Sequence, residues 1–201
     1  MSEYKGDKDG VLKDNELIRA FQSGDRGAFD ILVERYKDFV FNLCCRFLGD
    51  KHEAEDTAQD IFVKVFCSIK KFGFRSSFYT WLYRISVNTC INRVRSLEYR
   101  RRKKNISLDC PDDPVDIHRK MEINDGGKTP ETELEKKERI RLIQKAIDSL
   151  PVKQKVVIIL SDIQGLSYDE IGRITGMKSG TIKSRLSRAR LGLREKLRGI
   201  V

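Results

Sequence analysis

Apolar residues recur at intervals of three and four positions in separate stretches of this 201-residue chain. That spacing places side chains on one face of an α-helix, whereas a half-buried strand alternates apolar and polar residues. The clearest examples are Phe29, Leu32, Val33, Tyr36, Val40, Leu43 and Phe47 in the first half, and Ile140, Ile143, Ile147 and Leu150 in the second. No run shows sustained alternation. The pattern therefore predicts an all-α fold of two small helical domains.

A segment of different composition separates the two groups of helices. Between Asn105 and Glu135 nine acidic residues face three basic ones, and three of the four prolines lie here together with two adjacent glycines. Such a composition is typical of a flexible linker. We therefore expect a flexible tail at residues 1–14, a first domain at 15–104, an acidic linker at 105–134 and a second domain at 135–201.

The rest of the chain is basic. Lysine and arginine total 40 against 30 acidic residues, which gives a net charge of +10 and an isoelectric point near 9.4. The bases are concentrated in residues 93–104 and 178–198, at the end of each predicted domain. An excess of this kind suits a polyanionic partner such as nucleic acid.

The composition argues against several other classes of protein. Five cysteines without a Cys-x-x-Cys pair, and only two histidines, argue against a zinc site or a disulfide framework, so we expect no cofactor. Free thiols suit a reducing cytoplasm. The first fifteen residues lack the apolar core of a signal peptide, and no later stretch of 18 residues is apolar throughout. We therefore expect a cytoplasmic protein without a membrane-inserted segment.

The second domain contains the pattern of a helix-turn-helix. Ser167 and Glu170 have the spacing of a capping box, in which each side chain accepts a hydrogen bond from the other residue's backbone N–H. Gly176 suits the short turn that follows, and Ser179 is expected to cap the next helix. That helix would expose Lys183, Ser184, Arg185, Ser187, Arg188 and Arg190. Basic and hydroxyl side chains of this kind contact DNA in its major groove.

The first domain offers two further polar surfaces. Asp56, Gln59 and Asp60 lie at i, i+3 and i+4, so they share one exposed face of a helix. The following loop, residues 70–77, interleaves aromatic rings with cations and small hydroxyls. Because rings stack on unpaired bases and cations hold phosphates, this loop favours single-stranded nucleic acid. Trp81, in the next helix, is expected to pack in the core.

These motifs together resemble those of the extracytoplasmic-function (group IV) bacterial sigma factors. Residues 56–66 are similar to the family's region 2.2, and residues 78–88 to its regions 2.3 and 2.4. Residues 165–171 and 180–190 are similar to its region 4.2. The resemblance implies an alternative sigma factor without enzymatic activity, which binds core RNA polymerase and directs it to specific promoters. It would recognise and melt the minus-10 element and contact the minus-35 element.

The resemblance also implies roles for individual residues. Asp56, Gln59 and Asp60 would bind the clamp-helix coiled coil of the largest polymerase subunit. The melted minus-10 element would contact Lys71, Phe72, Phe74, Arg75, Ser76, Ser77 and Asn88. The adjacent DNA backbone would contact Arg100, Arg101, Arg102, Lys103 and Lys104. The minus-35 duplex would contact Lys183, Ser184, Arg185, Ser187 and Arg188. A cognate anti-sigma factor is a further expected partner.

Two other functions compete with this interpretation. A free-standing helix-turn-helix regulator would share the second domain, but it would carry a sensing or dimerising domain in front and would not need the aromatic loop. A nucleic-acid-processing enzyme would need a metal cluster or a nucleophile beside a base, and the sequence offers neither. Gly127-Lys128-Thr129 resembles the end of a phosphate-binding loop, but Glu122 takes the place of its first glycine.

Overall fold

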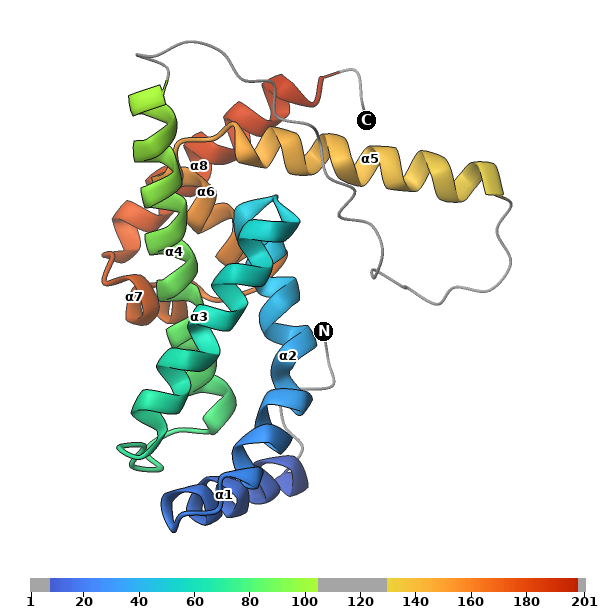
Figure 1. Cartoon of the computed structure of the whole chain (residues 1–201). Helices are drawn as coiled ribbons and strands as arrows, with labels where there is room; N and C mark the ends of the chain where they lie inside the picture. The colour runs from blue at the N-terminus through green and yellow to red at the C-terminus, as the bar shows by residue number, and fades with distance from the viewer. Residues whose placement is uncertain (1–7, 105–129, 199–201) are drawn as a thin grey trace. The chain divides into compact units, whose positions relative to one another are not determined.

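The computed structural model describes residues 8–104 and 130–198. Every element in these two ranges is a helix (Figure 1), which confirms the predicted all-α fold. The first range contains α1 (Lys8–Gln22), α2 (Gly27–Leu48), α3 (Lys51–Ile69) and α4 (Phe78–Lys104). The second contains α5 (Pro130–Asp148), α6 (Val152–Ile158), the short π-helix η2 (Ile159–Ile163), α7 (Tyr168–Thr175) and α8 (Ser179–Lys196).

The chain divides into two compact units. The first comprises Met1–Cys44 and His52–Cys90, and the second comprises Cys45–Lys51 and Ile91–Val201. Helix α4 crosses the division, since its first half belongs to the first unit and its second half to the other. Each unit buries its own set of apolar side chains, as two small helical domains require.

In the first unit α2, α3 and α4 lie side by side (Figure 1). Each helix turns one apolar stripe inward. Leu32 and Val40 of α2, Ile61 of α3, and Leu82 and Val87 of α4 are all fully buried. Burying one such side chain contributes about 1.5–3 kcal/mol. The stripes that the three-and-four spacing predicts are therefore the main source of stability in this unit.

Two cysteines meet inside this core. The Sγ atoms of Cys44 on α2 and Cys90 on α4 are 3.7 Å apart, and both side chains are buried. The hydrogen bond with Cys90, together with burial, raises the pKa of the Cys44 thiol above its usual value. The Cys44 thiol therefore stays protonated, and the two buried side chains pack like small apolar groups. Cys67 is exposed on α3, and Cys110 lies outside the described residues.

Helix α1 corrects the predicted N-terminal tail. The helix begins at Lys8, so residues 8–14 are helical, whereas the sequence predicted a flexible tail through residue 14. The reason is Asp14, which is only 3% exposed and accepts hydrogen bonds from Arg35 and Tyr36 of α2. A buried carboxylate needs such partners. They lie 21 and 22 positions away along the chain, so the polar composition of the first residues concealed the helix.

Helix α5 begins at Pro130, inside the segment that the sequence predicted to be linker. Proline suits the first turn of a helix, where its missing N–H costs no hydrogen bond. The second domain therefore begins before residue 135, the start that the sequence predicted. The remainder of the predicted linker, residues 105–129, and residues 1–7 of the predicted tail lie outside the described residues.

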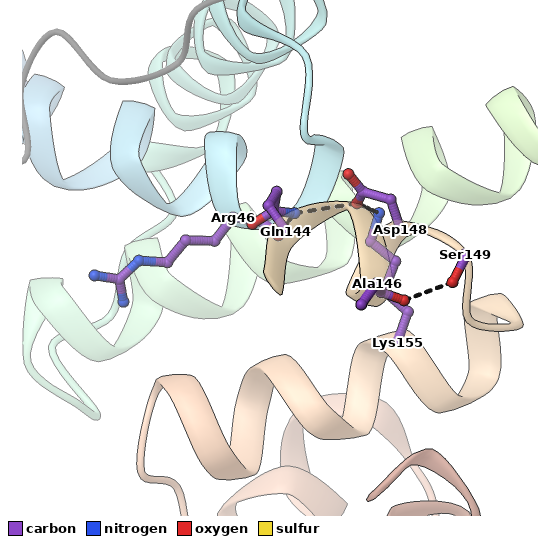
Figure 2. Close-up of polar contacts among 6 residues, drawn as sticks. All are labelled: Arg46, Gln144, Ala146, Asp148, Ser149 and Lys155. Atoms are coloured by element: carbon purple, nitrogen blue, oxygen red, sulfur yellow. Dashed lines mark hydrogen bonds and ion pairs between the residues drawn. The ribbon is translucent and has the colours of Figure 1, made fainter. Parts of the chain in front are cut away.

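The second unit is built around α8, which packs against α6 and α7. Leu160, Ile171, Ile182 and Leu186 are among its fully buried side chains. Lys155 is also buried, and its Nζ donates to the carboxylate of Asp148 at 2.6 Å (Figure 2). The side-chain amide of Gln144 donates to the same carboxylate at 3.1 Å. These contacts satisfy a charge that burial would otherwise leave without a partner.

Replacing the buried carboxylate tests whether α1 belongs to the fold. Asp14→Ala should destabilise the protein by about 1–3 kcal/mol, because it leaves the buried Tyr36 hydroxyl and Arg35 without their acceptor. Urea denaturation followed by circular dichroism measures the loss. Asp38→Ala, which removes an exposed carboxylate from α2, is the matched control and should behave as wild type. Equal stability of the two variants would contradict the role of Asp14.

Candidate nucleic-acid interface

Helix α3 presents an acidic face opposite its buried stripe. Its N-terminal half buries Ala54, Thr57, Ala58 and Ile61. Asp56, Gln59 and Asp60 lie on the other side, and all three are exposed, as their spacing predicted. The structure therefore brings these three residues together on one accessible surface, which suits a basic partner.

The same face of α3 continues into an apolar region that the sequence analysis missed. Val63 is 62% exposed and Phe66 is 43% exposed, and they follow Asp60 at steps of three. The signal was present in the sequence, because 56, 59, 60, 63 and 66 continue one three-and-four series. The Phe66 ring nevertheless packs in a T-shaped arrangement with Phe21 and Phe29, at centroid distances of 5.3 and 5.1 Å.

The loop between α3 and α4 is held in a defined shape at both ends. At its start, the backbone N–H groups of Lys71 and Phe72 donate to carbonyls in the last turn of α3. At its end, the Ser77 hydroxyl accepts a hydrogen bond from the N–H of Thr80 at 3.2 Å, so Ser77 caps α4. Ser77 was predicted to contact DNA, and the structure also gives it this structural role.

Phe74 carries backbone strain at the centre of this loop. Its φ of 55° lies in the left-handed region, and it is the only residue other than glycine with a positive φ in the described part of the chain. For an L-residue with a Cβ that conformation costs about 1–2 kcal/mol. Strain of this kind persists only where surrounding contacts hold it, and it is concentrated at functional sites. The ring of Phe74 is half-buried.

Phe72 departs from its predicted position. The sequence placed it among the residues that contact melted DNA, but its ring is only 6% exposed. It packs against Phe74 and Trp81 at 5.1 Å, and against Phe78 at 6.2 Å. Four rings meeting in one cluster bury more apolar area than an isolated ring on the surface. Phe72 therefore supports the loop from inside. Trp81 is only half-buried, at the edge of the core, where its ring packs against Phe72 and Phe78.

The cations and hydroxyls of the loop remain accessible. Lys71, Arg75 and Ser76 are exposed, as is Asn88 in α4, the helix that follows the loop. The half-buried Tyr79 stacks on Tyr83 near the start of α4, and burial raises the pKa of its phenol. The loop therefore combines a supported aromatic centre with an accessible basic rim.

Helix α4 continues to Lys104, so the basic tract at its end is helical. Arg100 is exposed. For Arg101, Arg102, Lys103 and Lys104 the structure describes the backbone but not the side chains. Their predicted contact with the DNA backbone remains an expectation.

The predicted helix-turn-helix is present in the second unit. The N–H of Glu170 donates to the Ser167 hydroxyl at 3.3 Å, and the N–H of Ser167 donates to the Glu170 carboxylate at 2.9 Å, which completes the capping box. Gly176 ends α7 with a φ of 71°, a conformation that glycine adopts without cost. Ser179 is a correction: the N-cap of α8 is Lys178, and no side chain caps that end.

Helix α8 turns its apolar residues inward and its polar residues outward. Ile182, Leu186 and Ala189 are buried. Four of the residues predicted to contact duplex DNA are exposed on the other faces, namely Lys183, Ser184, Ser187 and Arg188. The Lys183 Nζ also lies 6.0 Å from the centre of the Tyr168 ring of α7, a cation–π contact.

Two arginines of α8 are engaged within the protein. Arg185 is half-buried, and its guanidinium donates to the sulfur of Met177 in the turn. Arg190 donates to both carboxylate oxygens of Asp162 in η2, at 2.8 and 3.0 Å. The hydrogen bond to Asp162 raises the pKa of the Arg190 guanidinium. The exposed basic surface of α8 is therefore centred on Lys183 and Arg188.

Within residues 8–104 and 130–198, no group of three or more His, Cys, Asp or Glu side chains is arranged to hold a metal ion. In the same ranges no helix combines the length and the apolar character needed to cross a membrane.

Comparison with known proteins finds two regions of similarity. Residues 32–101 match the family described as Sigma-70 region 2, and residues 140–193 match the family described as Sigma-70, region 4. The chain is 38% identical to the ECF RNA polymerase sigma factor SigW of Bacillus subtilis, over 91% of this chain and 96% of the relative. It is 34% identical to the ECF RNA polymerase sigma-E factor of Haemophilus influenzae, over 94% of this chain and 98% of the relative.

Two solved structures are also similar. The sigma factor RpoE, solved in complex with the anti-sigma factor NepR from Bartonella quintana, matches with a TM-score of 0.60 and 26% identity, over 85% of this chain and 97% of that chain. CnrH, solved in complex with the cytosolic domain of CnrY, matches with a TM-score of 0.56 and 22% identity, over 92% and 97%. The second likeness concerns the fold alone.

Removing the capping box should weaken the helix-turn-helix. We expect Ser167→Ala to lower the free energy of unfolding of the second unit by about 1 kcal/mol, because the first turn of α7 loses its side-chain acceptor. Thermal denaturation measures the change. Ser179→Ala is the matched control, since Ser179 stands at the start of α8 and no side chain caps that end. The assignment fails if both variants lose the same stability.

Proposed function

Because the chain belongs to the extracytoplasmic-function family of sigma factors, we propose that its two units divide promoter recognition between them. The protein is an alternative sigma factor, which binds core RNA polymerase and directs it to specific promoters. One observation carries this conclusion. Both Sigma-70 regions occur in order along the chain, and 38% identity to a sigma factor extends over 91% of it.

The acidic face of α3 is the surface that binds the polymerase. Asp56, Gln59 and Asp60 are exposed together, and charge complementarity favours a basic partner surface. The exposed Val63 and Phe66 extend the same face and add apolar contact area. An interface with an apolar centre beside charged groups is typical of stable protein–protein contacts.

The loop between α3 and α4 holds the melted minus-10 element. Lys71, Arg75 and Ser76 are exposed for contacts with the phosphates and base edges, and Phe74 offers the ring that a flipped base stacks on. Flipping a base costs a few kcal/mol of lost stacking, which contacts in the loop offset. Phe72 does not contact the base but supports the ring of Phe74 by packing against it. Asn88 binds a neighbouring base.

Helix α8 recognises the minus-35 element as duplex. Lys183, Ser184, Ser187 and Arg188 are exposed on the second helix of the helix-turn-helix, which enters the major groove in this type of motif. Arg188 and Lys183 are suited to guanine O6 and N7. Arg185 donates to Met177 and Arg190 donates to Asp162, so both arginines position the helix. Any contact that they make with DNA is to phosphates and not to bases.

The basic end of α4 contacts the DNA backbone beside the melted segment, through Arg100 and the four residues after it. An anti-sigma factor regulates the protein, a proposal supported by the similar sigma factor that was solved in complex with one. The protein acts as a stoichiometric partner of the polymerase in the cytoplasm, without catalysing a reaction and without a cofactor.

Run-off transcription tests the function directly. Purified protein, added to core polymerase on a library of promoter fragments, should give promoter-specific transcripts. Replacing Asp56 and Asp60 together by lysine should weaken binding to core polymerase about tenfold or more, because like charges then face each other. Asp30→Lys reverses an exposed charge on α2 and is the matched control, expected to bind as wild type.

Two results would contradict this function. One is that the wild-type protein gives no promoter-specific transcript with core polymerase. The other is that the protein alone binds duplex DNA as a dimer and represses transcription, which is the behaviour of a free-standing helix-turn-helix regulator.

The minus-35 contact is tested separately on α8. Arg188→Ala should weaken binding to the preferred minus-35 duplex by about 1–3 kcal/mol and reduce discrimination against substituted base pairs. Arg194→Ala, an exposed arginine in the last turn of α8, is the control. It should change binding to all sequences alike, if at all. Unchanged discrimination in the Arg188 variant would remove Arg188 from base recognition.

A further inference from the structure

Helix α1 ends beside the loop between α3 and α4, at the same end of the first unit (Figure 1). The contact is made by Gln22, the last residue of α1. Its side-chain amide donates to the carbonyl oxygens of Ile69 at 3.0 Å and Phe72 at 3.2 Å, and lies 3.5 Å from that of Lys70. The last carbonyls of a helix have no partner within it, so an amide donor from another helix can define where the chain turns.

A second residue of α1 reaches the strained centre of the loop. The Arg19 guanidinium lies 5.3 Å from the centroid of the Phe74 ring, within the range of a cation–π contact. The Phe74 ring also packs on Phe72, at 5.1 Å. Phe74 is therefore held between a cation of α1 and the ring cluster of the core, while its backbone keeps a left-handed φ of 55°.

We propose that α1 is part of the minus-10 site, and that Gln22 and Arg19 are positioning residues for base capture. Gln22 fixes the backbone on both sides of Lys70 and Lys71, and Arg19 fixes the ring of Phe74. Neither residue needs to touch DNA to act. This inference rests on the proposed function, since it assumes that the loop holds a melted base.

The contacts of α1 separate this role from simple packing. Helix α1 is anchored in the core by Ile18 and Phe21, which are buried. Gln22 is half-buried and Arg19 is exposed, so neither belongs to that anchor. Substituting them should change the shape of the loop while the helix stays in place. A purely structural role would instead lower stability and every binding activity together.

Isosteric variants distinguish hydrogen bonding from side-chain volume. Gln22→Glu keeps the size of the side chain, but a carboxylate cannot donate to carbonyl oxygens. Gln22→Ala removes both size and donor. Arg19→Met removes the cation and keeps the length, whereas Arg19→Lys keeps a cation. Glu16→Ala changes another exposed residue of α1 and is the matched control.

The full-length variants are assembled with core polymerase, and the DNA probe carries the minus-10 sequence of a promoter that the wild-type protein uses. The readout is binding of a single-stranded minus-10 oligonucleotide, with the flipped base intact or substituted. Both Gln22 variants should lose about tenfold in affinity for the intact oligonucleotide and most of their discrimination, since one lost stacking or hydrogen-bond contact is of this order. Arg19→Met should lose several-fold, Arg19→Lys should regain most of it, and Glu16→Ala should match wild type.

Each variant should keep the wild-type affinity for core polymerase and for minus-35 duplex. Its thermal stability should fall only slightly, since Gln22 is half-buried and Arg19 is exposed. The inference is overturned if Gln22→Ala and Gln22→Glu discriminate like wild type. It is overturned equally if Gln22→Glu behaves as wild type while Gln22→Ala does not, or if all activities and stability fall in parallel. Failure of the proposed function is distinguishable, because the wild-type protein itself would then give no promoter-specific transcript.

Discussion

Burial of one apolar stripe per helix is the constraint on which the rest of this structure depends. Small helical units have room to cover only one side of each helix, so the opposite side stays in contact with solvent or with a partner. In α3 the buried side carries Ala54, Ala58 and Ile61, and this leaves the Asp56-Gln59-Asp60 face outside. In α8 burial of Ile182, Leu186 and Ala189 likewise leaves Lys183 and Arg188 outside. The surfaces that we propose to bind polymerase and DNA are thus the helix faces that the cores leave exposed.

The loop between α3 and α4 obeys a different constraint. It lies outside both helices, and it contains a residue in the left-handed conformation, Phe74. Its shape therefore depends on side-chain contacts. Within the loop, Phe72 packs on Phe74 and Ser77 caps α4, and from α1 Gln22 and Arg19 contact the loop. Such support suits the proposed capture of a base, because a loop that is already ordered loses less conformational entropy when it binds DNA.

In the second unit the turn geometry decides which side chains of α8 are available. The capping box starts α7, Gly176 ends it in a left-handed conformation, and α8 follows after a short turn. The contacts of Arg185 with Met177 and of Arg190 with Asp162 then engage two of the arginines within the protein. Two basic side chains of α8 are thus engaged within the protein, and the proposed minus-35 contact depends on the exposed Lys183 and Arg188.

The sequence by itself determined the all-α fold, the exposed polar face of α3 and the capping box, because each depends on residues within one or two helical turns. Helical periodicity places Asp56, Gln59 and Asp60 together, and the Ser167-Glu170 pair closes a hydrogen-bonded ring over three positions. Only the tertiary structure decided that residues 8–14 fold through Asp14, that Phe72 is buried, and that α1 reaches the loop. The side chain of Gln22 and the carbonyl of Phe72 are 50 positions apart. No local pattern specifies such a contact, because chain packing alone brings the two groups within hydrogen-bonding distance.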